Sequence, residues 1–248
     1  MKLTGGVRRA LEEGLFQAAA VGEIWAAHTG NRTLQLLTKP VAVPLLGLKA
    51  VRRRAELDPV ELPVLVAGLL AAGVGDYYMS RSDEDDQIVR GATAFGAMQL
   101  LYAAVLTRRG SRPHPRTVVL PAAAWATATA LLAARREPGR TKVPAVLAAY
   151  ATTLAGTLTL AQDPRPARLP GVVTRLVRPT SDPRTWLPAG ALLFAASDAA
   201  ILLRRTLLTD PRARAAAHVF VLASYNAAQW LLVEGFLAQS GRACEETA

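Results

Sequence analysis

Long apolar stretches separated by short, charge-rich bursts are the feature that most constrains the fold of this 248-residue chain. The charges do not follow helical faces, and the apolar stretches between them run about 16–22 residues, the length that one membrane-spanning helix needs. This alternation is typical of a protein that crosses a membrane several times. The bursts lie at Arg52–Arg54, Arg81–Arg90, Arg108–Arg116, Arg135–Lys142, Arg165–Arg184 and Arg204–Arg214.

We predict an all-α, polytopic integral membrane protein with about eight transmembrane helices in a single domain, residues 1–248. Basic residues are slightly more numerous in the segments on one side, which favours a cytoplasmic N-terminus and C-terminus. The composition, rich in Ala, Arg and Pro, suggests a bacterial source and hence the bacterial inner membrane. The predicted spans are 12–28, 33–50, 60–80, 88–107, 117–134, 143–161, 187–204 and 215–237.

The formal net charge of +10 raises the question of a nucleic-acid partner. No basic helix face, zinc pattern or interleaving of aromatic and basic residues supports one, so the basic loops are better explained as topology signals that contact anionic membrane lipids. The three histidines share no ligand spacing, and Cys244 is the only cysteine. We therefore expect no metal site and no cofactor, and the sequence identifies no protein partner.

Two aspartates lie inside predicted spans, although a carboxylate costs about 2.5–3.5 kcal/mol at the bilayer centre. Asp76 is on the third span and Asp198 on the seventh, so their helices run in the same direction. Each follows the glycine of an Ala-Gly pair, Gly68 or Gly190, by 8 residues. This shared spacing indicates a 4+4 parallel repeat. Chance in a chain rich in alanine and glycine explains it equally well.

Asp76 and Asp198 are the candidate catalytic pair, because an intramembrane carboxyl is rarely kept without a function. The competing interpretations are an interfacial helix-end residue for Asp76 and a structural hydrogen bond between helices for Asp198. Small residues flank Asp198, which predicts the drier setting and the role of proton donor. Asp76 stands beside Tyr77 and Tyr78, nearer a span end and water, and is expected to be the base.

Other polar residues reach overlapping depths and are candidates to line a cavity between helices. Lys39, near a span end, either extends to the membrane interface or holds a substrate phosphate. Tyr225 and Gln229 are four residues apart on one helix face, where they either line the site or join helices. Glu23 and Gln99 lie on the first and fourth spans, and Glu23 is given no role.

With these features the chain resembles the YhhN-like membrane family, whose characterised members are lysoplasmalogenases. The resemblance runs from about residue 33 to residue 237 and rests on the order, spacing and placement of short motifs. These motifs are Lys39-Pro40, Gly75-Asp76, Phe95, Tyr102, Leu193-Phe194, Ser197-Asp198, Tyr225 and Ala228-Gln229.

The resemblance implies a membrane hydrolase that cleaves the vinyl ether bond of a lysoplasmalogen. The products are a fatty aldehyde and a glycerophospho-ethanolamine or glycerophospho-choline, and the lysolipid is the expected partner. Asp76 and Asp198 would supply acid and base catalysis, as the two carboxyls of glycosidases do. The substrate-binding residues would be Lys39, Gln99, Tyr102, Tyr225 and Gln229.

Gln99 is a departure from the family, because relatives often carry histidine four residues after the aromatic of the fourth span. Glutamine cannot titrate, so a proton-transfer role for that histidine would put the activity in question here, whereas a role in orienting a head group would be preserved. Two other functions compete with hydrolysis. One is a proton-coupled transporter or lipid flippase that uses the same aspartates, and the other is a non-catalytic lipid-binding membrane protein.

Overall fold

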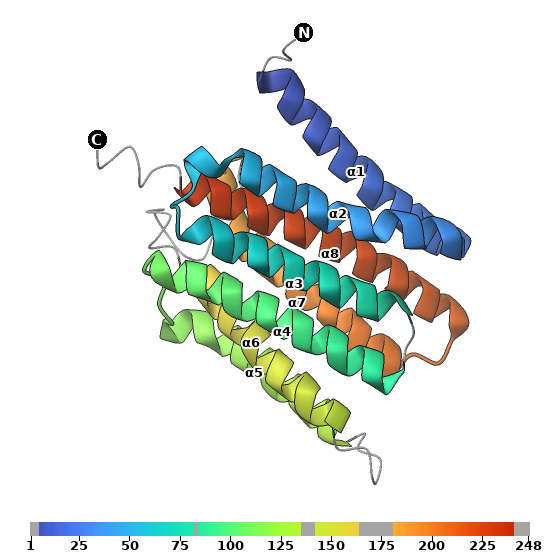
Figure 1. Ribbon diagram of the computed structural model, residues 1–248. Coiled ribbons are helices and arrows are strands. Elements are labelled where there is room, and N and C mark those ends of the chain that lie inside the picture. The colour runs from blue at the N-terminus through green and yellow to red at the C-terminus, as the bar shows by residue number, and fades with distance from the viewer. Residues whose placement is uncertain (1–4, 82–83, 135–141, 164–180, 241–248) are drawn as a thin grey trace.

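The computed structural model describes residues 5–81, 84–134, 142–163 and 181–240. Within these ranges the chain forms eight long helices that run alternately up and down and two short 3-10 helices, and it forms no strand (Figure 1). The prediction of an all-α fold is confirmed. The helices are α1 (Gly5–Thr29), α2 (Arg32–Arg52), η1 (Arg54–Glu56), α3 (Glu61–Arg81), α4 (Asp85–Arg108), α5 (Pro115–Ala134), α6 (Lys142–Ala161), η3 (Pro183–Thr185), α7 (Trp186–Thr206) and α8 (Pro211–Ser240).

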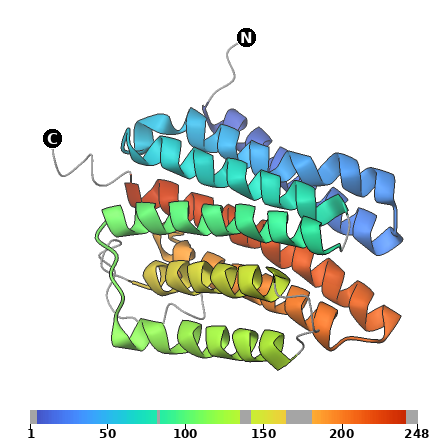
Figure 2. The ribbon, with the colours of Figure 1, turned by 60° about the horizontal axis from the view of Figure 1, so that its bottom comes forward.

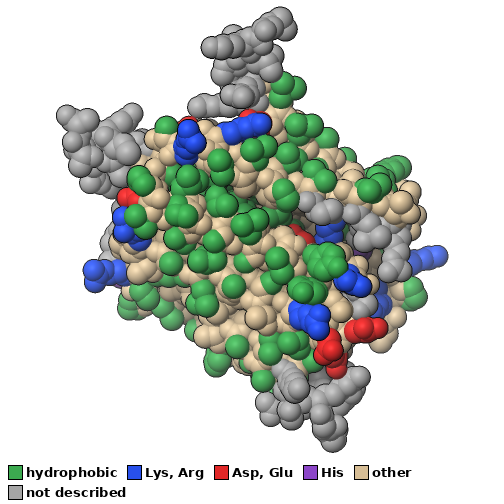
Figure 3. All heavy atoms as spheres, viewed as in Figure 1, with side chains coloured by type: hydrophobic (Ala, Val, Ile, Leu, Met, Phe, Trp, Pro, Cys, Tyr) green, Lys and Arg blue, Asp and Glu red, His purple; other side chains and the backbone are tan. Residues whose placement is uncertain are grey.

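Six of these helices, α3 to α8, are long and apolar enough to cross a membrane. The other two, α1 and α2, are also long, at 25 and 21 residues, but neither contains an apolar stretch of the same kind. On the face shown in Figure 3, apolar side chains spread over the middle of the molecule and charged side chains gather toward its ends. The chain is therefore a polytopic integral membrane protein, as predicted, whereas its organisation as a single domain stays a prediction.

The two ends of the described chain lie at the same end of the bundle. Ion pairs between Arg52 and Glu12 and between Lys49 and Glu234 join the start of α1, the end of α2 and the end of α8. We call the opposite end, where α1, α3 and α7 end, the far end. Termini on one side agree with the predicted topology, but which side is cytoplasmic stays a prediction.

The helices pack most extensively in two consecutive pairs, α3 with α4 and α7 with α8. Gly68 of α3 lies against the ring of Tyr102, and Gly190 of α7 lies against Leu232. These are the two glycines of the shared spacing, and each contacts the helix that follows its own. Small residues let membrane helices approach closely. The shared eight-residue spacing thus places a glycine at the same kind of helix–helix contact in both halves of the chain. This favours the 4+4 repeat without establishing it.

Replacing Gly190 by alanine is expected to lower the free energy of unfolding by about 1–3 kcal/mol. The new Cβ would lie 3.0 Å from the backbone N of Leu232 and 3.1 Å from the carbonyl O of Ala228, so that α7 and α8 would have to separate. Gly73→Ala is the matched control, because no heavy atom lies within 4 Å of its Cβ position. It should stabilise the helix by about 0.5–1 kcal/mol. Unfolding by denaturing detergent gives both values, and equal effects would contradict the close approach.

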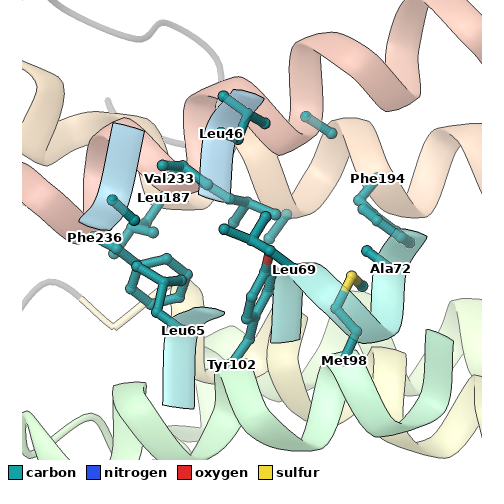
Figure 4. Close-up of a cluster of buried hydrophobic side chains, with 14 of the residues drawn as sticks. Leu46, Leu65, Leu69, Ala72, Met98, Tyr102, Leu187, Phe194, Val233 and Phe236 are labelled. Carbon is teal, nitrogen blue, oxygen red and sulfur yellow. The ribbon is translucent and has the colours of Figure 1, made fainter. Parts of the chain in front are cut away.

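The hydrophobic core fills the centre of the bundle (Figure 4). Most of its side chains come from α2, α3, α4, α7 and α8, and α1 and α6 add Phe16, Leu158 and Ala161. Tyr102 and Phe236 are fully buried there, with ring centroids 5.2 Å apart. The helix α5 lies at the edge of the bundle and packs mainly on α6 (Figure 2). Of the six apolar helices, α5 is therefore the least buried.

A buried ion pair locks three helices together at the end that holds the termini. Arg109 donates to Glu61 through Nη2 at 2.7 Å and through Nε at 3.1 Å, and both side chains are less than a tenth exposed. Ser240 of α8 donates to the same carboxylate at 2.7 Å. Breaking a buried pair leaves an uncompensated charge, which costs about 3–5 kcal/mol.

We therefore expect Arg109→Met to lower the free energy of unfolding by about 3–5 kcal/mol. Arg108→Met is the matched control, because Arg108 and its partner Asp58 are 49% and 42% exposed and such pairs contribute little. Unfolding in detergent micelles measures both variants. A loss of stability in Arg108→Met as large as that in Arg109→Met would show that burial of the pair is not what matters.

Candidate functional site

The candidate catalytic aspartates lie in the half of the bundle nearer the far end. At 1.5 Å per residue, Asp76 is about 8 Å from the end of α3 and Asp198 about 12 Å from the end of α7. Glu23 lies about 9 Å from the end of α1, and Lys39 about 10 Å from the start of α2. The polar groups of interest therefore occupy one layer of the bundle, near the far end.

Asp198 has a tyrosine partner on the neighbouring helix α6. The hydroxyl of Tyr150 donates to Oδ2 of Asp198, and the side chain of Gln99 on α4 lies near the same tyrosine. Gln99 is held in turn by Thr157, whose Oγ1 donates to its backbone carbonyl at 2.8 Å. We call these three residues, Asp198, Tyr150 and Gln99, the Asp198 unit.

The Asp198 unit faces a cavity of about 440 Å³ between α4, α5, α6 and α7. Most of its lining is aliphatic, and Asp198 and Tyr150 are among the few polar side chains that reach it. A cavity with apolar walls and a few placed polar groups suits a small, mostly apolar ligand. Phe95, Trp125, Leu154, Leu202 and Arg205 also line it.

Asp76 has its own tyrosine partner, on α8. The hydroxyl of Tyr225 donates to Oδ2 of Asp76 at 2.6 Å, and Nε2 of Gln229 donates to the Tyr225 oxygen at 3.3 Å. The hydroxyl of Tyr102 donates to Oε1 of Gln229 at 3.0 Å. We call Asp76, Tyr225 and Gln229 the Asp76 unit. Each aspartate thus accepts a hydrogen bond from a tyrosine that has a glutamine beside it, and the two units share no residue.

An aromatic cluster stands between the two units. The ring centroids of Phe95, Phe194 and Tyr225 lie 5.6–6.2 Å from one another, in edge-to-face arrangements. Phe95 lines the cavity on one side and packs on Gly75 on the other, where an added Cβ would lie 2.8 Å from its ring. The described residues show no direct contact between the carboxyls of Asp76 and Asp198, and the aromatic cluster explains why.

A third carboxyl lies next to the Asp76 unit. Glu23 of α1 is 2% exposed, and its Oε2 accepts a hydrogen bond from Nδ2 of Asn226 at 2.9 Å. Lys39 of α2 is close enough to interact electrostatically with both Glu23 and Asp76. Four helices, α1, α2, α3 and α8, therefore converge on this charged group.

The structure separates the sequence-predicted site residues into two sets. Asp76, Tyr225, Gln229, Tyr102 and Lys39 lie on one side of the aromatic cluster, whereas Asp198 and Gln99 lie on the cavity side. Asp76 lies nearer its helix end than Asp198, as expected, but it is only 6% exposed, whereas Asp198 is half-buried and lines the apolar cavity. Neighbouring residues in sequence did not reveal the burial of Asp76, because the side chain that contacts its carboxyl, Tyr225, comes from α8.

Sequence reasoning missed Tyr150 and Asn226, which hold Asp198 and Glu23. The signal for Tyr150 was present, because it is the only tyrosine of the sixth span and a buried carboxyl needs a hydrogen-bond donor. Asn226 is a polar residue within the eighth span and adjoins Tyr225. Nothing in the sequence indicated that its partner would come from the first span.

Comparison with known proteins identifies one family. The model of the YhhN family matches residues 34–236, which include both aspartates, Lys39 and both tyrosine–glutamine partners. Glu23 precedes the matched range. Searches of curated proteins and of solved structures found no match.

Proposed function

The chain belongs to the YhhN family, whose model matches most of it, and we propose that it hydrolyses the vinyl ether bond of a lysoplasmalogen. The products are a fatty aldehyde and a glycerophosphodiester. The observation that carries the proposal is the apolar cavity with Asp198 and Tyr150 in its wall. An alkenyl chain can lie in such a cavity, with its ether end at the carboxyl.

The reaction needs an acid that delivers a proton to carbon. Protonation of the β-carbon of the vinyl ether gives an oxocarbenium ion, to which water adds at the α-carbon with loss of a proton. The resulting hemiacetal collapses to the aldehyde and the free alcohol of the glycerol. No metal or other cofactor takes part in this sequence, which two carboxyl groups and water complete.

Asp198 is the proposed proton donor because it lines the cavity that the chain would occupy. Tyr150 donates to one oxygen of the carboxyl, which leaves the other oxygen to carry the proton. A fixed orientation of this kind brings the acid within reach of its target, on which proton transfer depends. Phe95 and Phe194 add aromatic rings next to the same place, and aromatic faces stabilise a neighbouring cation.

Asp76 is the proposed carboxylate that stabilises the oxocarbenium ion and accepts the proton of the attacking water. It lies behind the aromatic cluster, so this role requires the ring of Phe95 to turn away when the substrate binds. Tyr102 and Gln229 are fully buried, and we assign them the support of Tyr225 rather than contact with the substrate. The two aspartates lie in the half of the bundle nearer the far end, which faces the periplasm if both termini are cytoplasmic.

The test is incubation of purified protein in detergent with matched lysolipids that carry a vinyl ether, an alkyl ether or an ester. The proposal predicts aldehyde from the vinyl ether, no product from the alkyl ether and no free acid from the ester. Acid from the ester alone would identify a lysophospholipase instead. Absence of products in detergent, together with lipid or proton movement across sealed vesicles under a gradient, would identify a transporter or flippase.

A further inference from the structure

The carboxylate of Glu23 has one oxygen that lacks a partner. Its Oε2 receives the amide of Asn226, but Oε1 is buried and accepts no hydrogen bond within the described part of the chain. Burying an acceptor without a hydrogen-bond donor is unfavourable, and more so when the acceptor is charged. A bound ligand that carries a hydrogen-bond donor would give Oε1 of Glu23 the partner that it lacks.

The cation nearest to this carboxylate is not bound to it. Lys39 interacts electrostatically with Glu23 and Asp76, but in the residues that the structure describes its ammonium makes no hydrogen bond or ion pair. Lys39 is half-buried, whereas Glu23 is enclosed. The Glu23 carboxylate and the Lys39 ammonium therefore lie close together, and each can still make a hydrogen bond.

The position of these two residues suits the polar end of a lysolipid. They lie about 9–10 Å inside the far end of the bundle, next to Asp76. In a lysolipid only the glycerol unit separates the ether bond from the phosphodiester, and an amino alcohol follows. A chain placed in the cavity with its ether between the two aspartates therefore directs its head group toward α1 and α2.

We propose that Lys39 and Glu23 form a head-group site that selects a primary ammonium, as in ethanolamine. Lys39 binds the phosphodiester, and Oε1 of Glu23 accepts a hydrogen bond from the ammonium. A trimethylated ammonium, as in choline, has no N–H to donate and leaves this oxygen unpaired. The inference rests on the proposed function for the identity of the lipid, but it makes a separate statement about affinity.

Binding of non-hydrolysable alkyl-ether lysolipids measures this selectivity without any reaction. The series runs from ethanolamine through its N-methyl and N,N-dimethyl forms to choline. A hydrogen bond to a charged group contributes about 1.5–3 kcal/mol, so the wild-type protein should bind the ethanolamine lipid about 10- to 100-fold more tightly than the choline lipid. The dimethyl form keeps one N–H and should bind more tightly than choline.

In Glu23→Gln the ratio of the two affinities should fall close to one. Glu13→Gln is the matched control, since Glu13 lies on the same helix, is half exposed and pairs with Lys49 at the opposite end. It should keep the wild-type ratio. Equal affinity of the wild-type protein for both lipids, or a ratio that Glu23→Gln leaves unchanged, overturns the proposal.

Selective binding of the head group and release of aldehyde can each be observed without the other. Selective binding without aldehyde release would retain the head-group site and reject the hydrolase, whereas aldehyde release without selectivity would do the reverse. If Glu23→Gln fails to fold, the ligand series in the wild-type protein decides, because it removes the same hydrogen bond from the side of the ligand.

Discussion

Replacing Asp198 by asparagine is expected to lower the rate of aldehyde release by about 10²–10⁴-fold, the contribution of a positioned general acid. Asparagine has nearly the same shape and can still accept the hydrogen bond from Tyr150, but it has no proton to give to carbon. The protein should insert and fold normally. Initial rates of aldehyde formation from a lysoplasmalogen, compared with thermal unfolding in the same detergent, measure both properties.

Two variants show whether this loss is chemical. Tyr150→Phe keeps the ring but removes the hydroxyl that orients Asp198, so a smaller decrease is expected, with little change in unfolding temperature. Asp86→Asn is the matched control, because Asp86 is exposed at the start of α4 and touches no part of the site. Substantial activity in Asp198→Asn would remove Asp198 from the mechanism.

Asp76→Asn should also abolish most of the activity, by about 10²-fold or more, because a general base contributes on that scale. Residues that act as one unit show strongly non-additive effects. Tyr225→Phe removes the 2.6 Å hydrogen bond to Asp76 and should lower the rate less, while the double variant should be no slower than Asp76→Asn alone. Rates of aldehyde formation for the four proteins complete this cycle.

The cycle also separates catalysis from structural support. If Asp76 only joined α3 to α8, its replacement would lower the unfolding temperature and the rate together, and the loss of activity would be recovered at lower temperature. If it serves as the base, the rate falls in a protein of normal stability. If the effects of Asp76→Asn and Tyr225→Phe on the rate simply add, the two residues do not act as one unit.

The helical architecture was predictable because bilayer thickness fixes the length of each apolar stretch. The two aspartates were predictable as site candidates for a related reason, since the cost of an intramembrane charge marks them out. Gly68 and Gly190 were noted only for their spacing. Their contacts with Tyr102 and Leu232 give that spacing a physical meaning, namely close approach of α3 to α4 and of α7 to α8.

The environment of each aspartate was not predictable, because it depends on helices distant in sequence. Asp76 is enclosed by Tyr225, which lies 149 residues away, and the rings of Phe95 and Phe194 divide the two carboxyls. Gln99, expected to bind substrate, lies near Tyr150, the partner of Asp198. A glutamine can support Tyr150 without titrating, so its presence in place of histidine is compatible with an active site.

Hydrolysis in D₂O tests most directly whether the protein transfers a proton to the β-carbon of a vinyl ether. The acid exchanges its proton with solvent, so the account predicts one deuterium on the carbon next to the aldehyde in each product molecule. Immediate reduction of the aldehyde to the alcohol preserves this label for mass spectrometry. Aldehyde released without deuterium at that carbon, or fatty acid in place of aldehyde, would contradict the account.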